Sequence, residues 1–131
     1  MKWKPLNEKS IETLKEVAGV YWIRSNMKIK RLFGVDNQGL LMIGASKNLH
    51  DRIWAFYVAS TGQRKSMQHI EGQRYHYFKI RKLHKGELEF KYQKTKNKKE
   101  AFAKENMLLE QYEIRHKELP PLNKTGGWKG V

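Results

Sequence analysis

The chain has 131 residues and a mass of 15.6 kDa, which fits a single domain large enough to bury its own core. It contains no cysteine, and this excludes a disulfide scaffold, a cysteine-based zinc finger and a thiol nucleophile. Lysine and arginine number 27 against 13 acidic residues, so the net charge of +14 predicts a polyanionic partner, with nucleic acid the first choice.

The sequence has no apolar run near the roughly 20 residues that cross a bilayer, so we expect no membrane partner. The N-terminal stretch lacks the apolar region of a secretory signal, which predicts a cytoplasmic, intracellular protein. We find no internal repeat and no flexible linker. The expected organisation is therefore one domain over residues 1–131.

In chain order, residues 7–18 carry Ile11, Leu14 and Val17 at helical spacing and predict a short amphipathic helix. The β-branched and aromatic segment GVYWIRS, which begins at Gly19, predicts a strand. The segment GLLMIG, residues 39–44, predicts a second strand. We expect these two strands to pair as a hairpin across a long basic connection.

Ser46 is the predicted N-cap of a helix that runs to about residue 59. Residues 74–83, RYHYFKIRKL, are ambiguous, because their aromatic content favours a strand while their length suits a helix. ELEFKYQ, from Glu87, alternates apolar and charged residues and predicts a half-buried strand. A long helix over residues 98–117 follows and is broken by Pro120.

The final helix places a carboxylate where a core is expected. An apolar arc of about 120° on a helical wheel contains Ala101, Phe102, Leu108, Leu109 and Tyr112, and Glu105 lies in the middle of that arc, about 40° from Ala101. A carboxylate among core side chains is costly unless it is paired or binds a metal. A structural ion pair with Arg52 or a lysine is one explanation, and a catalytic role is the other.

Arg52 lies at the border of the buried arc on the earlier helix. A guanidinium can hold phosphate oxygens and a carboxylate can hold a hard divalent cation, so Arg52 and Glu105 together fit phosphodiester chemistry. The hydroxyls of Tyr21, Tyr57 and Tyr112 are candidates for the same pocket. A buried tyrosine with a satisfied hydroxyl is the commoner explanation for any one of them.

Five short motifs then occur in one order. Gly19-Val20-Tyr21 resembles a GIY motif, and Met42-Ile43-Gly44 resembles a degenerate YIG. Arg52 stands 52 − 44 = 8 residues after the glycine of the second motif. Glu105 begins ENMLL on the final helix, and Asn123 ends LPPLN. Together these segments resemble the GIY-YIG nuclease domains, over about residues 17–124.

The resemblance implies a mixed α/β (α+β) fold, with a small three-stranded antiparallel sheet flanked by helices in the order β-β-α-α-β-α. The predicted N-terminal helix is extra to this core. Residues 74–83 then become the second helix of the middle pair, against their strand-like composition.

The resemblance also implies a site that cleaves phosphodiesters with one divalent metal, Mg²⁺ or Mn²⁺, and needs no small-molecule cofactor. Glu105 would hold the metal, Arg52 would stabilise the phosphate, and Tyr21 would position the attacking water. Asn123 would order the site through hydrogen bonds. Met42 replaces the tyrosine of the second motif.

A second departure lies on the earlier helix, where Phe56 stands at a position that is His or Tyr in many members. His50 is interpreted as a surface residue.

The function expected first is a metal-dependent endonuclease that cleaves DNA. Phosphate contacts are expected from basic residues of the loops, namely Lys28, Lys30, Arg31, Arg64, Lys65, Arg74 and Lys124. The alternative is a catalytically impaired GIY-YIG-derived module that binds nucleic acid without cutting it, which Met42 and Phe56 favour. An RNA-binding or ribosome-associated protein would explain the charge but not the motifs. A homodimer or an unidentified protein partner stays open.

Overall fold

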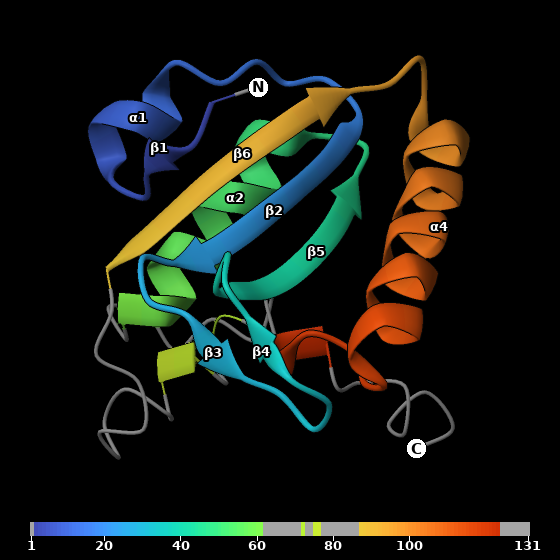
Figure 1. The fold of residues 1–131 in the computed structure, drawn as a ribbon. Coiled ribbons are helices and arrows are strands. Elements are labelled where there is room, and N and C mark those ends of the chain that lie inside the picture. Colours follow the sequence, from blue (N-terminus) through green and yellow to red (C-terminus); the bar gives the residue numbers. More distant parts are fainter. Residues whose placement is uncertain (1, 62–71, 73–74, 77–86, 124–131) are drawn as a thin grey trace.

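The computed structural model describes residues 2–61, 72, 75–76 and 87–123. Its centre is an antiparallel sheet of four strands in the order β1-β6-β2-β5 (Figure 1). The strands are β1 (Lys4–Pro5), β2 (Gly19–Ser25), β5 (Leu40–Ser46) and β6 (Leu88–Lys94). The three long strands are those predicted from the sequence. The two-residue β1, which pairs with β6, was not predicted.

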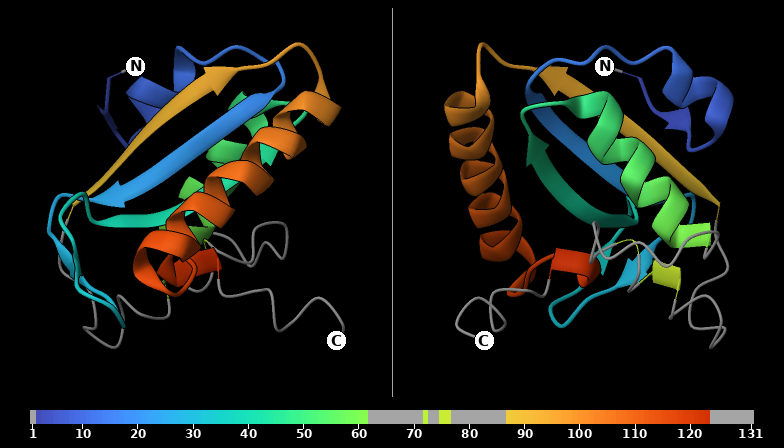
Figure 2. Two further views of the ribbon diagram at one scale, coloured as in Figure 1. Left: turned by 45° about the vertical axis from the view of Figure 1, so that its right-hand side comes forward. Right: turned by 180° about the vertical axis from the view of Figure 1, so that it is seen from behind.

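Helices cover both faces of this sheet. The short α1 (Glu8–Glu12) and α2 (Leu49–Thr61) lie on one face, and α4 (Lys98–His116) lies on the other (Figure 2). A 3-10 turn, η1 (Pro121–Asn123), follows α4 and contacts β5. The mixed α/β class and the flanked antiparallel sheet predicted from the sequence are confirmed.

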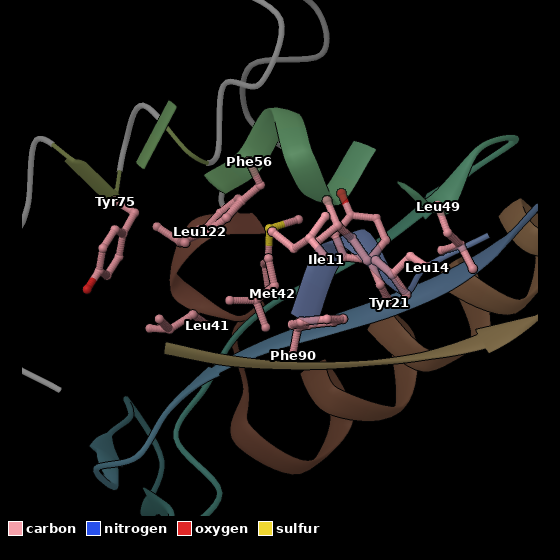
Figure 3. Close-up of a cluster of buried hydrophobic side chains, with 12 residues drawn as sticks. Ile11, Leu14, Tyr21, Leu41, Met42, Leu49, Phe56, Tyr75, Phe90 and Leu122 are labelled. Atoms are coloured by element: carbon pink, nitrogen blue, oxygen red, sulfur yellow. The ribbon is translucent and has the colours of Figure 1, made fainter. Parts of the chain in front are cut away.

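The side chains of β2 belong to two separate hydrophobic clusters, because successive side chains of a strand point to opposite faces of the sheet. Tyr21 and Ile23 enter a cluster between the sheet, α1 and α2 (Figure 3). Val20 and Trp22 enter a second cluster beneath α4. The central strand is therefore buried on both faces, which explains its continuous apolar sequence.

The connection between β2 and β5 contains a small hairpin that sequence reasoning missed. Its strands are β3 (Ile29–Lys30) and β4 (Val35–Asp36). Gly34 closes the turn with a φ of 81°, a conformation that favours glycine. The side chain of Arg31 ties this hairpin to the segment after α4, as described below.

Asparagine side chains cap the N-termini of α1, α2 and α4. At α1, the Asn7 side chain accepts a hydrogen bond from the Ser10 N–H at 2.8 Å. The Asn97 side chain accepts a hydrogen bond from the Glu100 N–H at 2.9 Å, at the start of α4. Asn48 accepts from the Asp51 N–H at 3.0 Å, just before α2. The prediction that Ser46 caps α2 is therefore wrong: Ser46 ends β5, and its hydroxyl instead accepts from the Asn48 N–H.

The helix expected over residues 74–83 falls mainly outside the described residues. Within it the structure describes Tyr75 and His76, whose backbone is helical. Tyr75 is buried and its ring centroid lies 6.4 Å from that of Phe56. Among the helices that the structure describes, none has the length and apolar character needed to cross a membrane.

Candidate active site

A pocket of about 330 Å³ lies between β5, α2 and the N-terminal half of α4. Its walls include Tyr21 from β2, Arg52 from α2, Glu105 from α4 and Asn123 from η1. The remaining lining residues are Met42, Ile43, Gly44, Ala45, Ser46, Lys47, Lys98 and Phe102. The four site residues predicted from the sequence, which span positions 21 to 123 of the chain, thus meet in one place.

Tyr21 reaches this pocket by lying across the neighbouring strand. It is the cross-strand partner of Gly44, and its side chain is only 1% exposed. A Cβ atom at position 44 would lie 2.5 Å from the Tyr21 Oη and 2.7 Å from its Cε1. Glycine is therefore required at position 44 because the tyrosine ring occupies the space of a side chain.

Asn123 fixes the outer edge of β5. Its Oδ1 accepts from the Ile43 N–H at 2.8 Å, and its Nδ2 donates to the Ile43 carbonyl at 2.9 Å. The amide thereby satisfies both backbone groups of one residue, as a neighbouring strand would. The contact holds the strand that carries Met42 and Gly44 against the 3-10 turn.

Glu105 and Arg52 line the pocket as partly exposed side chains. The predicted apolar arc on α4 is narrower than expected, because Phe102 is 39% exposed while Ala101 and Tyr112 are buried. The interpretation of Glu105 as a core carboxylate is corrected accordingly. It stands at the border of the core, where contact with solvent reduces the cost of its charge.

Two lysines complete the pocket and were missed in the sequence. Lys47 follows β5 directly, and Lys98 is the first residue of α4; both are exposed. Lys98 stands seven residues before Glu105, a spacing that places both on one helix face. This spacing could have identified Lys98 from the sequence, but several other lysines lie close to residue 98 and the pattern does not distinguish it from them.

The other two tyrosine candidates lie elsewhere. The Tyr112 hydroxyl donates to the Asp36 Oδ2 at 2.8 Å in a buried contact, away from this pocket. Burial and this hydrogen bond raise the pKa of the Tyr112 phenol, so it does not act as a proton acceptor near neutral pH. Tyr57 packs against Trp54, with ring centroids 5.6 Å apart, and does not line the pocket.

Met42 and Phe56 are core residues, 2% and 0% exposed (Figure 3). Their environment explains their apolar chemistry, and Met42 adds no hydrogen-bonding hydroxyl to the pocket. His50 lies outside the pocket, with its Nδ1 3.0 Å from the Asp51 Oδ1.

The predicted phosphate-contacting residues divide into three groups. Lys28 and Lys30 are exposed, as that role requires. Arg31 is corrected: its side chain is 6% exposed, bonds the Leu119 carbonyl at 2.6 Å and pairs with Glu118 at 3.0 Å. It anchors the hairpin instead of forming a phosphate-binding surface. The remaining four lie outside the described residues, namely Arg64, Lys65, Arg74 and Lys124.

The donor set of the pocket suits a hard divalent cation held partly by substrate. Among the described residues, no group of three or more histidine or acidic side chains could enclose a metal ion. Mg²⁺ keeps several waters and commonly takes one or two carboxylates together with substrate phosphate. A single pocket carboxylate, Glu105, open to solvent beside cationic side chains fits that mode of binding.

The arrangement of β2, β5 and β6 between α2 and α4 is the fold of the GIY-YIG endonuclease domains. The structure is similar to the crystal structure of the GIY-YIG N-terminal endonuclease domain of UvrC from Thermotoga maritima, bound to its catalytic divalent cation, magnesium. The TM-score is 0.50 at 20% identity, over 88% of this chain and 92% of that domain. The GIY-YIG-like fold predicted from the motifs is thus confirmed.

Two point-mutant structures of the same Thermotoga maritima domain, each bound to its catalytic divalent cation, align with TM-scores of 0.47. They are 20% and 19% identical to this chain; the alignments cover 88% of it and 91% and 92% of theirs. Comparison of the sequence with protein-family models gave no match, and comparison with curated proteins gave no significant one.

Proposed function

We propose that the protein is a metal-dependent endonuclease that cleaves phosphodiester bonds of DNA. The observation that carries the proposal is the convergence of Tyr21, Arg52, Glu105 and Asn123 on one pocket. The GIY-YIG fold supports it, because endonuclease domains share this arrangement.

In this proposal, the Arg52 guanidinium binds the non-bridging oxygens of the scissile phosphate and offsets the charge that develops during the reaction. The exposed ammonium groups of Lys47 and Lys98 hold the neighbouring stretch of the backbone at the pocket mouth. These three cations make the pocket electropositive and favour a phosphodiester over neutral substrates.

Glu105 is the proposed protein ligand of Mg²⁺ or Mn²⁺. When bound, such an ion would lower the pKa of a coordinated water and stabilise charge on the phosphate. The Tyr21 hydroxyl orients the attacking water by hydrogen bonding, and its direction is fixed by the close packing of the ring on Gly44. Asn123 is a positioning residue, because it acts on the strand through Ile43.

The test is a nicking assay on supercoiled and branched DNA with Mg²⁺, Mn²⁺ or EDTA. We expect metal-dependent cleavage that is lost in Glu105→Gln and Arg52→Ala, while the DNA affinity of Glu105→Gln is retained. Glu110→Gln, an exposed carboxylate five residues further along α4, and His50→Ala are the controls and should cleave normally. Unchanged cleavage by Glu105→Gln would refute the assignment of the site.

The second candidate function is a nucleic-acid-binding module that does not cut. The burial of Met42 and Phe56 favours it, since these positions supply no hydroxyl or imidazole to the chemistry. Tight, salt-sensitive binding without cleavage of any substrate in the nicking assay would select this alternative.

A further inference from the structure

A second and larger groove, of about 1040 Å³, lies at the other end of α4. It runs between the β3–β4 hairpin, the turn into β5 and the C-terminal half of the helix. Its lining includes the ring-bearing side chains Trp22, Phe33, Tyr112 and His116 and the amide side chains Asn37, Gln38 and Gln111. The proposed cleavage mechanism uses none of these residues.

The rings of this groove differ in exposure. Trp22 and Tyr112 are each only 9% exposed, and the ring of Tyr112 lies 4.4 Å from that of His116. Phe33, on the hairpin, also lines the groove and is 63% exposed. A large aromatic side chain that is mostly exposed to solvent is accessible for stacking by another planar group.

Cationic side chains stand at the groove. Arg115 lines it and is exposed, and the Lys117 Nζ lies 5.9 Å from the centroid of the Phe33 ring. The Lys91 Nζ lies 5.0 Å from the Trp22 ring. The acidic residue of the lining, Asp36, already accepts hydrogen bonds from the Tyr112 hydroxyl and from the Gln38 and Leu40 N–H groups. The charge therefore favours an anionic ligand.

Aromatic faces, amide side chains and cations suit the three parts of an unpaired nucleotide. A base stacks on an aromatic ring whatever its identity, amides hydrogen bond to exposed base edges, and lysine or arginine contacts the phosphate. Within a duplex, both faces of a base are covered by its stacked neighbours, so a ring such as Phe33 stacks most readily on an unpaired base. We propose that this groove binds an unpaired segment of a nucleic acid strand.

The position of the groove relates it to the candidate active site. Ile43 lines both hollows, and Glu105 in the first stands ten residues before Arg115 in the second on the same helix. A helix rises about 1.5 Å per residue, so these residues are about 15 Å apart along the axis. That distance is a few nucleotides along a strand, since nucleotides in a duplex are about 3.4 Å apart and an unpaired strand can extend further.

This placement rests on the proposed function and extends it. A strand cut at the first pocket would enter the second groove a few nucleotides away, so the preferred substrate carries unpaired nucleotides close to the scissile bond. The binding of unpaired nucleotides itself does not depend on cleavage, and it is tested without metal.

The experiment measures fluorescence anisotropy of labelled DNA in EDTA, with a single strand, a blunt duplex and a duplex ending in an unpaired tail. Phe33→Ala is the main variant, and its exposed side chain makes normal folding the expectation, checked by thermal melting. We expect about tenfold weaker binding of the single strand and the tailed duplex, with blunt-duplex affinity unchanged. Arg115→Ala should act on the same two substrates.

Met107→Ala is the matched control, because Met107 is 48% exposed on the same helix but does not line the groove. It should leave all three affinities unchanged. Lys28→Ala should weaken binding to every substrate alike, as expected for a phosphate contact outside the groove.

Equal effects of Phe33→Ala on paired and unpaired DNA, or no effect, would overturn the proposal. A self-association seen by sedimentation that Phe33→Ala abolishes, with DNA affinities unchanged, would also overturn it and assign the groove to a second copy of the chain. A failure of the cleavage assay alone leaves the anisotropy result intact, so the two proposals fail separately.

Discussion

Replacing Gly44 by alanine tests whether the Tyr21 ring is fixed by the strand beneath it. The new methyl group would lie 2.5 Å from the Tyr21 Oη and 2.7 Å from its Cε1, distances at which one group must move. Tyr21 is 1% exposed and packed in the core, so it has little room to yield. Overpacking of this kind costs about 1–3 kcal/mol of the free energy of unfolding.

The same displacement should reduce catalysis. A shift of about 1 Å in a positioned group can lower a rate about a hundredfold. We therefore expect Gly44→Ala to lower both the melting temperature, measured by calorimetry, and the single-turnover cleavage rate. DNA affinity should change little, because the cationic side chains of the pocket are unaltered.

A double-mutant cycle gives the sharpest control. Tyr21→Leu removes the ring atoms that the methyl group would meet, so adding Gly44→Ala in that background should cost less stability than in the natural chain. Equal costs in the two backgrounds would show that the close approach of the two residues is not what requires glycine.

Three further predictions concern the contacts around the site. Asn123→Ala removes both hydrogen bonds to Ile43 and should lower the free energy of unfolding, measured by urea denaturation, by about 1–3 kcal/mol. An unchanged urea midpoint would show that these hydrogen bonds do not stabilise the fold. Arg31→Met should destabilise the protein without changing its DNA affinity, whereas Lys30→Ala should weaken DNA binding and leave stability unchanged. Weaker DNA binding by Arg31→Met at unchanged stability would show that Arg31 contacts phosphate after all. The pKa of Tyr112 is raised above 10.0, so its stabilising effect is complete below pH 10 and is lost as pH rises toward the pKa of the folded state. Tyr112→Phe should therefore lose less stability than the natural protein when melted above pH 10. If the melting temperatures of the two proteins fall in parallel with pH, ionisation of Tyr112 is not the cause of the loss.

The sequence predicts elements well where local preference and packing agree. Continuous β-branched and aromatic residues in β2 suit a strand buried on both faces, and a helical period marks α4. It fails where pairing is non-local, as for β1, which is two residues long and exists because β6 lies beside it. The Ser46 cap was wrong because Asn48, two residues later, competes for the same role.

The candidate site shows the same division. The order and spacing of the motifs predicted that one site contains Tyr21, Arg52, Glu105 and Asn123, and in the structure all four line one pocket. The periodicity of α4 overstated the burial of Glu105, because a helical wheel does not show where the pocket opens. The partners of Arg31 could not be foreseen, since its carbonyl acceptor lies 88 residues away in the sequence.

The amide of Asn123 also affects how molecules of this protein meet one another. β5 is one of the two edge strands of the sheet, and an unpaired strand edge is a template on which another chain can add its own strand. Asn123 occupies the N–H and the carbonyl of Ile43 at the middle of that edge. A chain that ends before residue 123 would expose these groups. Truncation there should therefore promote edge-to-edge association, and it would also remove Asn123 from the wall of the pocket.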